Sequence, residues 1–197
     1  MNESKQLQRK AQILDAALAV IVQKGYENSR MDDIVASSKM SKGAIYWYYK
    51  SKKEIYLSLV NHWVHNYSAV LNHIVDTDRS ASDQLRSLFQ YFTVQYEKDP
   101  VVFKALLEFW SMAGRDPEFN DKLQKVYSEF VNLISTIIQQ GMDNGEFKNL
   151  DLDITAMSIM VNIEGIMWFT LFKLKNTSAR EYIQTISDFI LSGLIKK

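Results

Sequence analysis

The feature that most restricts the fold of this chain is a helical periodicity that only short breaks interrupt. Apolar residues recur at the i, i+3, i+4, i+7 spacing of amphipathic helices, as at Leu14, Ala17, Leu18 and Ile21. Two prolines and seven glycines occur in 197 residues, so helix breakers are rare. No segment shows the alternation of a half-buried strand. The sequence therefore predicts an all-α fold of about nine helices.

The breaks in the periodicity set the expected bounds of these helices. Gly25 ends the first helix. Ser29 with Asp32, and Ser51 with Glu54, form capping-box patterns at the starts of the second and fourth helices. The expected helices span about 4–24, 30–37, 42–48, 52–75, 81–98, 101–113, 118–142, 152–173 and 178–195.

Residues 30–48 have the layout of a helix-turn-helix. A short helix is followed by a polar turn, and Ser41 then caps a second short helix. At 100° per residue, Ile45 and Tyr49 lie on the side of that second helix that faces a core. The opposite side and its flank can approach base edges and phosphates. These outward residues are Gly43, Ala44, Tyr46, Trp47 and Lys50.

Charge is divided unevenly along the chain, although the formal net charge is zero. Residues 1–60 hold ten Lys and Arg against six Asp and Glu, a net charge of +4, and residues 61–197 carry the compensating −4. A basic end on a more acidic body is typical of nucleic-acid binding. We therefore expect a helix-turn-helix DNA-binding domain over 1–52, with double-stranded DNA as a partner, and a separate helical domain over 53–197.

The N-terminal region resembles the tetracycline-repressor (TetR) family of transcription factors. Residues 9–60 carry the patterns GYxxS, MDDI and SKGxIYxYYxSKxE at fixed spacing. The segment LLEFWSMAGRDPEF (106–119) also resembles one found in many members, including the betaine-regulator subgroup. The resemblance implies a repressor that a small hydrophobic or amphipathic effector releases from a palindromic operator. It also implies a homodimer through the last two helices and an effector pocket among helices four to eight.

Carried over residue by residue, the resemblance implies DNA contacts from Lys42, Gly43, Tyr46, Tyr48 and Lys52. Three positions depart from the family pattern. Arg30 stands where Ser or Thr is usual and can offer a charged bond to phosphate. Lys39 replaces a common turn glycine, and Tyr48 replaces a histidine that could carry positive charge.

The body of the chain offers residues that can line either a core or an effector pocket, and the sequence does not separate these uses. Glu108 and Glu164 are costly to bury unpaired. Each carboxylate either finds a hydrogen-bonding partner in a dimer interface or orients an effector. A carboxylate among aromatic rings favours an amphipathic cation as that effector. The candidate effector residues are Phe89, Phe92, Phe103, Glu108, Trp110, Tyr127, Phe130, Glu164 and Trp168.

Other classes of function find little support. The chain has no cysteine, no nucleophile-elbow serine and no phosphate-binding loop, so we expect neither an enzyme nor a cofactor. His62 and His73 are too far apart along one helix to share a metal, and His62 with His65 lacks a third ligand. No metal is therefore expected. A helical adaptor that docks a protein through its exposed aromatics is the alternative hypothesis.

A membrane location is also not expected. The longest apolar stretch, 152–172, is interrupted by Asp153, Asn162 and Glu164, whereas a spanning helix needs about 20 residues with few or no charges. The N-terminus lacks an apolar run behind a basic start. We therefore expect a cytoplasmic protein.

Overall fold

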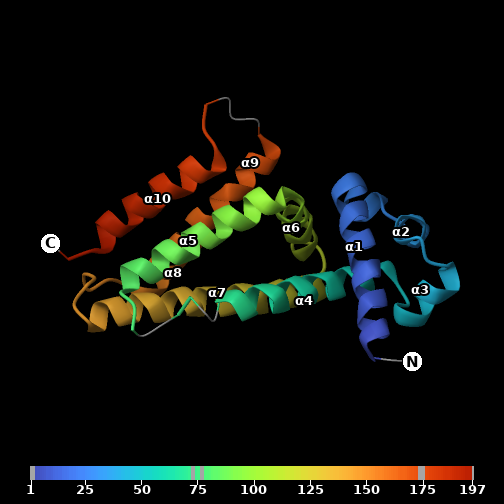
Figure 1. The fold of residues 1–197 in the computed structure, drawn as a ribbon, viewed down its shortest axis with the longest axis horizontal. Coiled ribbons are helices and arrows are strands. Elements are labelled where there is room, and N and C mark those ends of the chain that lie inside the picture. Colours follow the sequence, from blue (N-terminus) through green and yellow to red (C-terminus); the bar gives the residue numbers. More distant parts are fainter. Residues whose placement is uncertain (1–2, 72–73, 76–77, 173–175, 197) are drawn as a thin grey trace. The chain divides into compact units, whose positions relative to one another are not determined.

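The computed structural model describes residues 3–71, 74–75, 78–172 and 176–196, and the side chains of residues 3 and 63–71 lie outside that description. The expected all-α class is confirmed, since the described part of the chain contains helices and a single isolated β-bridge between Phe147 and Ile195 (Figure 1). The elements are α1 (Glu3–Asn28), α2 (Met31–Ser38), α3 (Lys42–Tyr48), α4 (Lys52–Leu71), α5 (Ala81–Lys98), α6 (Pro100–Ala113), α7 (Pro117–Asp143), α8 (Leu152–Glu164), the 3-10 turn η1 (Gly165–Met167), α9 (Trp168–Leu171) and α10 (Ala179–Leu194).

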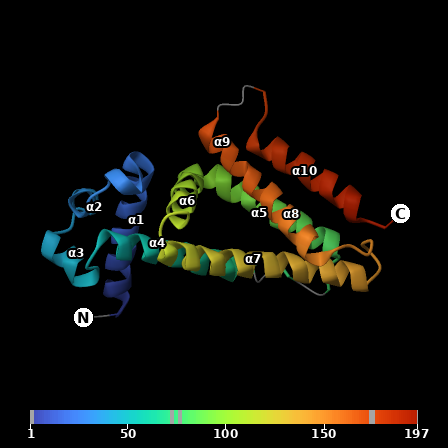
Figure 2. The ribbon, with the colours of Figure 1, turned by 180° about the vertical axis from the view of Figure 1, so that it is seen from behind.

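The chain forms two compact units, each with its own core. The first comprises Met1–Asn66 and Lys104–Leu123. In it α2 packs on α1, and α3 follows α2 (Figure 2). Fully buried residues from three helices, Ile21, Ile34 and Ile45, contribute to its core. Because the segment 104–123 clusters with the N-terminal helices, the unit is larger than the expected domain over 1–52, whose boundary stays a prediction.

The second unit comprises Tyr67–Phe103 and Gln124–Lys197. In it α10 packs against α5 and α8. The Glu146 carboxylate accepts hydrogen bonds from the amides of Ala81 (2.8 Å) and Ser82 (2.9 Å), at the N-terminus of α5. Carboxylates are favourable at this end of a helix, where amides lack partners in the helix itself. Glu146 thereby fixes the 144–151 loop to α5.

The start of α2 differs from the expectation by one residue. The expected capping box of Ser29 and Asp32 is wrong, because Arg30 is the N-cap and its amide donates to Asp33 at 2.8 Å. Ser29 is instead buried, and its hydroxyl donates to the Tyr26 carbonyl at 2.7 Å. The expected capping by Ser51 and Glu54 is confirmed, with Glu54 accepting from the amide of Lys50.

The single helix expected over 152–173 is also wrong, because it breaks at Gly165. A Cβ on Gly165 would lie 2.1 Å from the hydroxyl of Tyr182 on α10, so a side chain at position 165 would require that ring to move. The Tyr182 hydroxyl donates to the Asn162 carbonyl at 3.1 Å. It thereby supplies a donor to a backbone carbonyl at the point where α-helical geometry gives way to the 3-10 turn.

Lys39 ends α2 in the left-handed region, at φ 56° and ψ 25°, which L side chains other than Asn rarely adopt. Replacing Lys39 with Gly removes this strain, although it also raises the conformational entropy of the unfolded chain. We expect Lys39→Gly to raise the free energy of unfolding by up to about 1 kcal/mol. Urea denaturation checks this against Lys39→Ala, which keeps the strain. A glycine variant no more stable than the alanine variant would contradict it.

Candidate nucleic-acid interface

Local capping places α3 where the sequence predicts it. The Ser41 hydroxyl accepts from the Ala44 amide at 3.2 Å and opens the helix. At the other end, the Lys50 ammonium donates to the Tyr46 carbonyl at 2.8 Å, which suits a cation at a helix C-terminus. The predicted span of 42–48 is therefore confirmed.

The two faces of α3 also lie as expected. Ile45 is fully buried and Tyr49 is 5% exposed, whereas Trp47 is 59% exposed. Gly43 is exposed, and a Cβ there would meet nothing within 4 Å. Tyr48 is half-buried at the border, and so are Ala44 and Tyr46, which were expected to face outward. The helix thus presents a large apolar ring and an open stretch of backbone to solvent.

Trp47 is oriented by its neighbour. Its indole meets the Tyr48 ring edge-on, with centroids 4.6 Å apart. Such edge-to-face pairs are favourable because the positive edge of one ring meets the negative face of the other. The pair gives a short helix a defined aromatic surface in place of a freely rotating side chain.

Two of the cations that were predicted to contact DNA, Lys42 and Arg30, have exposed side chains. The Lys42 ammonium pairs with Asp32 at 2.7 Å, and this partner raises the lysine pKa. Both side chains are exposed, so water screens the pair and an anion can compete for the ammonium. Arg30, at the N-terminus of α2, is exposed as well. Both residues are available for phosphate contacts, which stay predictions.

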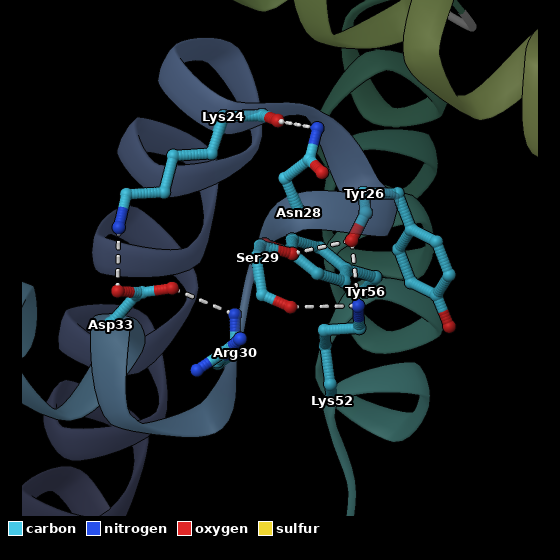
Figure 3. A network of polar contacts seen from close by, with 8 residues as sticks. All are labelled: Lys24, Tyr26, Asn28, Ser29, Arg30, Asp33, Lys52 and Tyr56. Atoms are coloured by element: carbon cyan, nitrogen blue, oxygen red, sulfur yellow. Dashed lines mark hydrogen bonds and ion pairs between the residues drawn. The ribbon is translucent and has the colours of Figure 1, made fainter.

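Lys52 is used differently from what the sequence suggests. Its ammonium donates to the carbonyls of Tyr26 (2.6 Å) and Ser29 (2.8 Å) and lies 4.1 Å from the centroid of the Tyr26 ring (Figure 3). Burial lowers the pKa of this lysine. A phosphate would have to compete with these interactions, so the predicted DNA contact by Lys52 stays a prediction.

Lys52 holds residues Gly25–Ser29, which run from a kink in α1 at Gly25 to the approach to α2, and a second side chain ties this segment to α4. The Tyr56 hydroxyl donates to the Ser29 hydroxyl at 3.2 Å, and burial raises the pKa of Tyr56 to about 12 (Figure 3). We call this segment the α1–α2 turn. Sequence reasoning missed this network, because it joins Lys52 and Tyr56 to residues 23 to 27 positions earlier and no local pattern marks it.

The expected effector residues fall into both units. Glu108 and Trp110 belong to the first unit, and the other seven belong to the second. Phe92 and Phe130 meet edge-on at 5.3 Å, and Phe103 meets Tyr96 at 5.4 Å. Phe89 and Phe103 are buried, whereas Trp168 is exposed. The structure therefore brings some of these rings together in the second unit, and their effector role stays a prediction.

Glu164 is a carboxylate of the second unit whose pKa is strongly shifted. Burial raises its pKa to about 7, against a hydrogen bond with Tyr127 that acts in the opposite direction. It is the last residue of α8, next to the break at Gly165. Near neutral pH this group is therefore divided between a neutral and a charged form.

Metal binding finds no candidate in the part of the chain that the structure describes, where no three His, Cys, Asp or Glu side chains are grouped as ligands. His62 belongs to this part and is exposed. The side chains of His65 and His73 lie outside the described residues.

Two family models match the chain. The model described as bacterial regulatory proteins, tetR family, matches residues 13–59, which include α2 and α3. The model described as BetI-type transcriptional repressor, C-terminal, matches residues 81–194. Together they cover both the candidate interface and the body that carries Glu164.

Individual relatives agree with these matches. The uncharacterized HTH-type transcriptional regulator YfiR of Bacillus subtilis (strain 168) is 30% identical over 175 residues, which are 83% of this chain and 80% of that protein. Among solved structures, a putative transcriptional regulator from Saccharomonospora viridis in complex with choline has a TM-score of 0.86 at 23% identity, covering 96% of this chain and 99% of its own. FadR from Bacillus subtilis, in complex with stearoyl-CoA, has a TM-score of 0.79 at 22% identity, covering 93% and 98%.

The raised pKa of Glu164 has a consequence for stability. An unfolded chain releases this proton near pH 4.5 and the folded protein near pH 7, so between these values the folded state binds more protons. The Glu164 contribution to the free energy of unfolding should therefore fall as pH rises through this window. Urea denaturation at pH 5 to 8 should show that Glu164→Gln becomes steadily more stable relative to the wild type. If the free energies of unfolding of the two proteins changed in parallel with pH, the pKa of Glu164 would not be raised by burial.

Proposed function

Because the chain belongs to the tetR family of bacterial regulatory proteins, it is a DNA-binding transcriptional regulator, and we propose that it is a repressor released from its operator by a small amphipathic effector. The observation that supports DNA binding most directly is the outward face of α3. Trp47 lies exposed opposite the buried Ile45, on a helix framed by cations. A large exposed apolar side chain lowers solubility and can mark a binding surface. Contact with a duplex would cover this indole.

DNA recognition follows from two copies of α3 in a symmetric dimer. Recognition helices related by a two-fold axis enter successive major grooves about 34–36 Å apart, or a multiple of that spacing, and read a palindrome. Gly43 and Ala44 allow close approach of the backbone, while Tyr46, Trp47 and Tyr48 contact base edges or sugar. Lys42 and Arg30 contact phosphate, and residues 1–52 act as the DNA-binding domain.

The effector is proposed to bind in the body of the chain, near Glu164. Two structural neighbours carry different ligands, choline in one and stearoyl-CoA in the other, so the fold alone does not select a chemistry. In this chain a half-buried carboxyl with a pKa of about 7 hydrogen-bonds to Tyr127. An organic cation would favour the ionised form and could rest on aromatic rings. We therefore favour an amphipathic cation, whose binding shifts the dimer away from the DNA-competent state.

The homodimer is proposed to form through the last helices, α8 to α10. Phe189 on α10 is 73% exposed, and Ile154, Met157 and Val161 on α8 are exposed as well. The segment Leu152–Leu171 is long and apolar enough to cross a membrane by composition, yet only a third of it is buried within the chain. A second copy of the chain could bury this exposed apolar face, as a lipid bilayer could. Asp153 and the break at Gly165 favour the second copy.

The adaptor alternative is not retained, since the relatives offer it no support. The proposal places the protein in the cytoplasm with its DNA.

DNA binding is tested with a duplex that the wild-type protein selects from a random pool. We expect Trp47→Ala to weaken binding roughly tenfold or more and Tyr46→Phe to weaken it less, because one removes a base contact and the other a single hydroxyl. Fluorescence anisotropy at several salt concentrations should give a steep loss of wild-type affinity with salt. Since Trp47 is exposed, Trp47→Ala should lower the free energy of unfolding by no more than about 1 kcal/mol, the worth of its edge-on contact with Tyr48. A wild-type protein that ignores every duplex at low salt refutes the proposal.

Dimerisation is tested by placing a charge on the exposed apolar face. Phe189→Arg enters a two-fold interface twice, so we expect dimerisation to weaken roughly tenfold or more. Analytical ultracentrifugation across a concentration series measures the effect. Lys125→Glu, at an exposed position on α7, serves as the control. If Phe189→Arg dimerises as tightly as this control, the interface lies elsewhere.

A further inference from the structure

The α1–α2 turn is held from α6 by one carboxylate. Glu108, on α6, accepts a hydrogen bond from the Tyr26 amide at 3.3 Å, although the two residues lie 82 positions apart. Gly25 leaves helical geometry at φ 72° and ψ 169°, a conformation that essentially only glycine adopts. The backbone at Tyr26 is thereby turned so that its amide reaches an acceptor on another helix.

Gly25 also provides the space for this contact. A Cβ at Gly25 would lie 3.2 Å from the same Glu108 oxygen that accepts from Tyr26. The carboxylate therefore rests directly on main chain that carries no side chain. Backbone conformation and side-chain clearance both depend on this one glycine.

Further contacts join residues 109–119 to the α1–α2 turn and to the start of α4. The Phe119 ring meets Tyr26 edge-on at 5.7 Å, and Phe109 meets Tyr56 at 6.3 Å. Lys53, at the start of α4, pairs with Asp116 and with Glu118 at 2.7 and 2.9 Å. The contacts explain why 104–123 forms one compact unit with α1 to α3.

We propose that Glu108 is a positioning residue for DNA binding: by holding the Tyr26 amide, it fixes the α1–α2 turn, and through that turn α2 and α3, in the arrangement that fits the operator. The proposal rests on the DNA-binding function proposed above. It gives Glu108 a role other than the effector contact expected from its place among aromatic residues.

Three variants of the full chain test this role. Glu108→Ala removes the acceptor, Glu108→Gln keeps a carbonyl oxygen that can accept from Tyr26, and Asp121→Ala removes an exposed carboxylate of the same segment as a control. Affinity for the duplex selected by the wild type is measured by anisotropy. Amide hydrogen exchange is measured by NMR at Tyr26, and at Ile45, whose amide donates to Ser41.

We expect Glu108→Ala to bind the duplex about tenfold more weakly and to exchange the Tyr26 amide about tenfold faster or more, while protection of Ile45 changes little. Glu108→Gln should stay close to the wild type in both measurements, and Asp121→Ala should match the wild type.

Several outcomes overturn the proposal. Glu108→Ala with normal affinity and normal exchange at Tyr26 shows that the contact has no role. Equal loss of protection at Tyr26 and Ile45 shows general destabilisation, and a Glu108→Gln variant as impaired as Glu108→Ala excludes the hydrogen bond as the cause. If the wild type binds no duplex, the proposed function fails. In that case the exchange at Tyr26 still decides whether Glu108 holds the turn.

Discussion

The burial of Ile45 is the constraint on which the interface depends. A helix of seven residues is too short to be stable alone, so packing of this side chain, together with the caps at Ser41 and Lys50, fixes its rotation about its own axis. Once Ile45 points inward, Trp47 points outward by geometry. The exposed indole is thus a consequence of core packing, and we propose that it forms part of the recognition surface.

The second level of organisation is the α1–α2 turn, where the main chain is satisfied by side chains from elsewhere. Lys52 supplies donors to two carbonyls of the turn, and Glu108 supplies an acceptor to one of its amides. Buried backbone groups that lack partners are costly, so such a turn is stable only while α4 and α6 stay in place.

Local patterns in the sequence were sufficient for most of the helices and for the most buried and most exposed residues of α3. Ser41 and Ser51 cap the helices that they were expected to cap, and Lys39 takes the left-handed conformation that its place in the turn suggests. The contacts that could not be predicted join residues far apart in the chain. Lys52 was expected to face phosphate, yet its ammonium contacts a turn 23 to 26 residues earlier. Periodicity also gave no sign of the break at Gly165, which depends on the approach of Tyr182.

We propose that the outward face of α3 lies in the major groove of each operator half-site, and DNA cleavage by a chelate attached next to α3 would show where this face lies. The natural chain has no cysteine, so a single Lys50→Cys substitution can carry an iron chelate that cuts DNA nearby. We expect two clusters of cuts, one in each half of the palindrome, separated by about one helical turn of DNA or a multiple of it. A chelate at Asp121→Cys should give no such pattern. If cleavage from position 50 were no more localised than cleavage from position 121, α3 would not be the recognition helix.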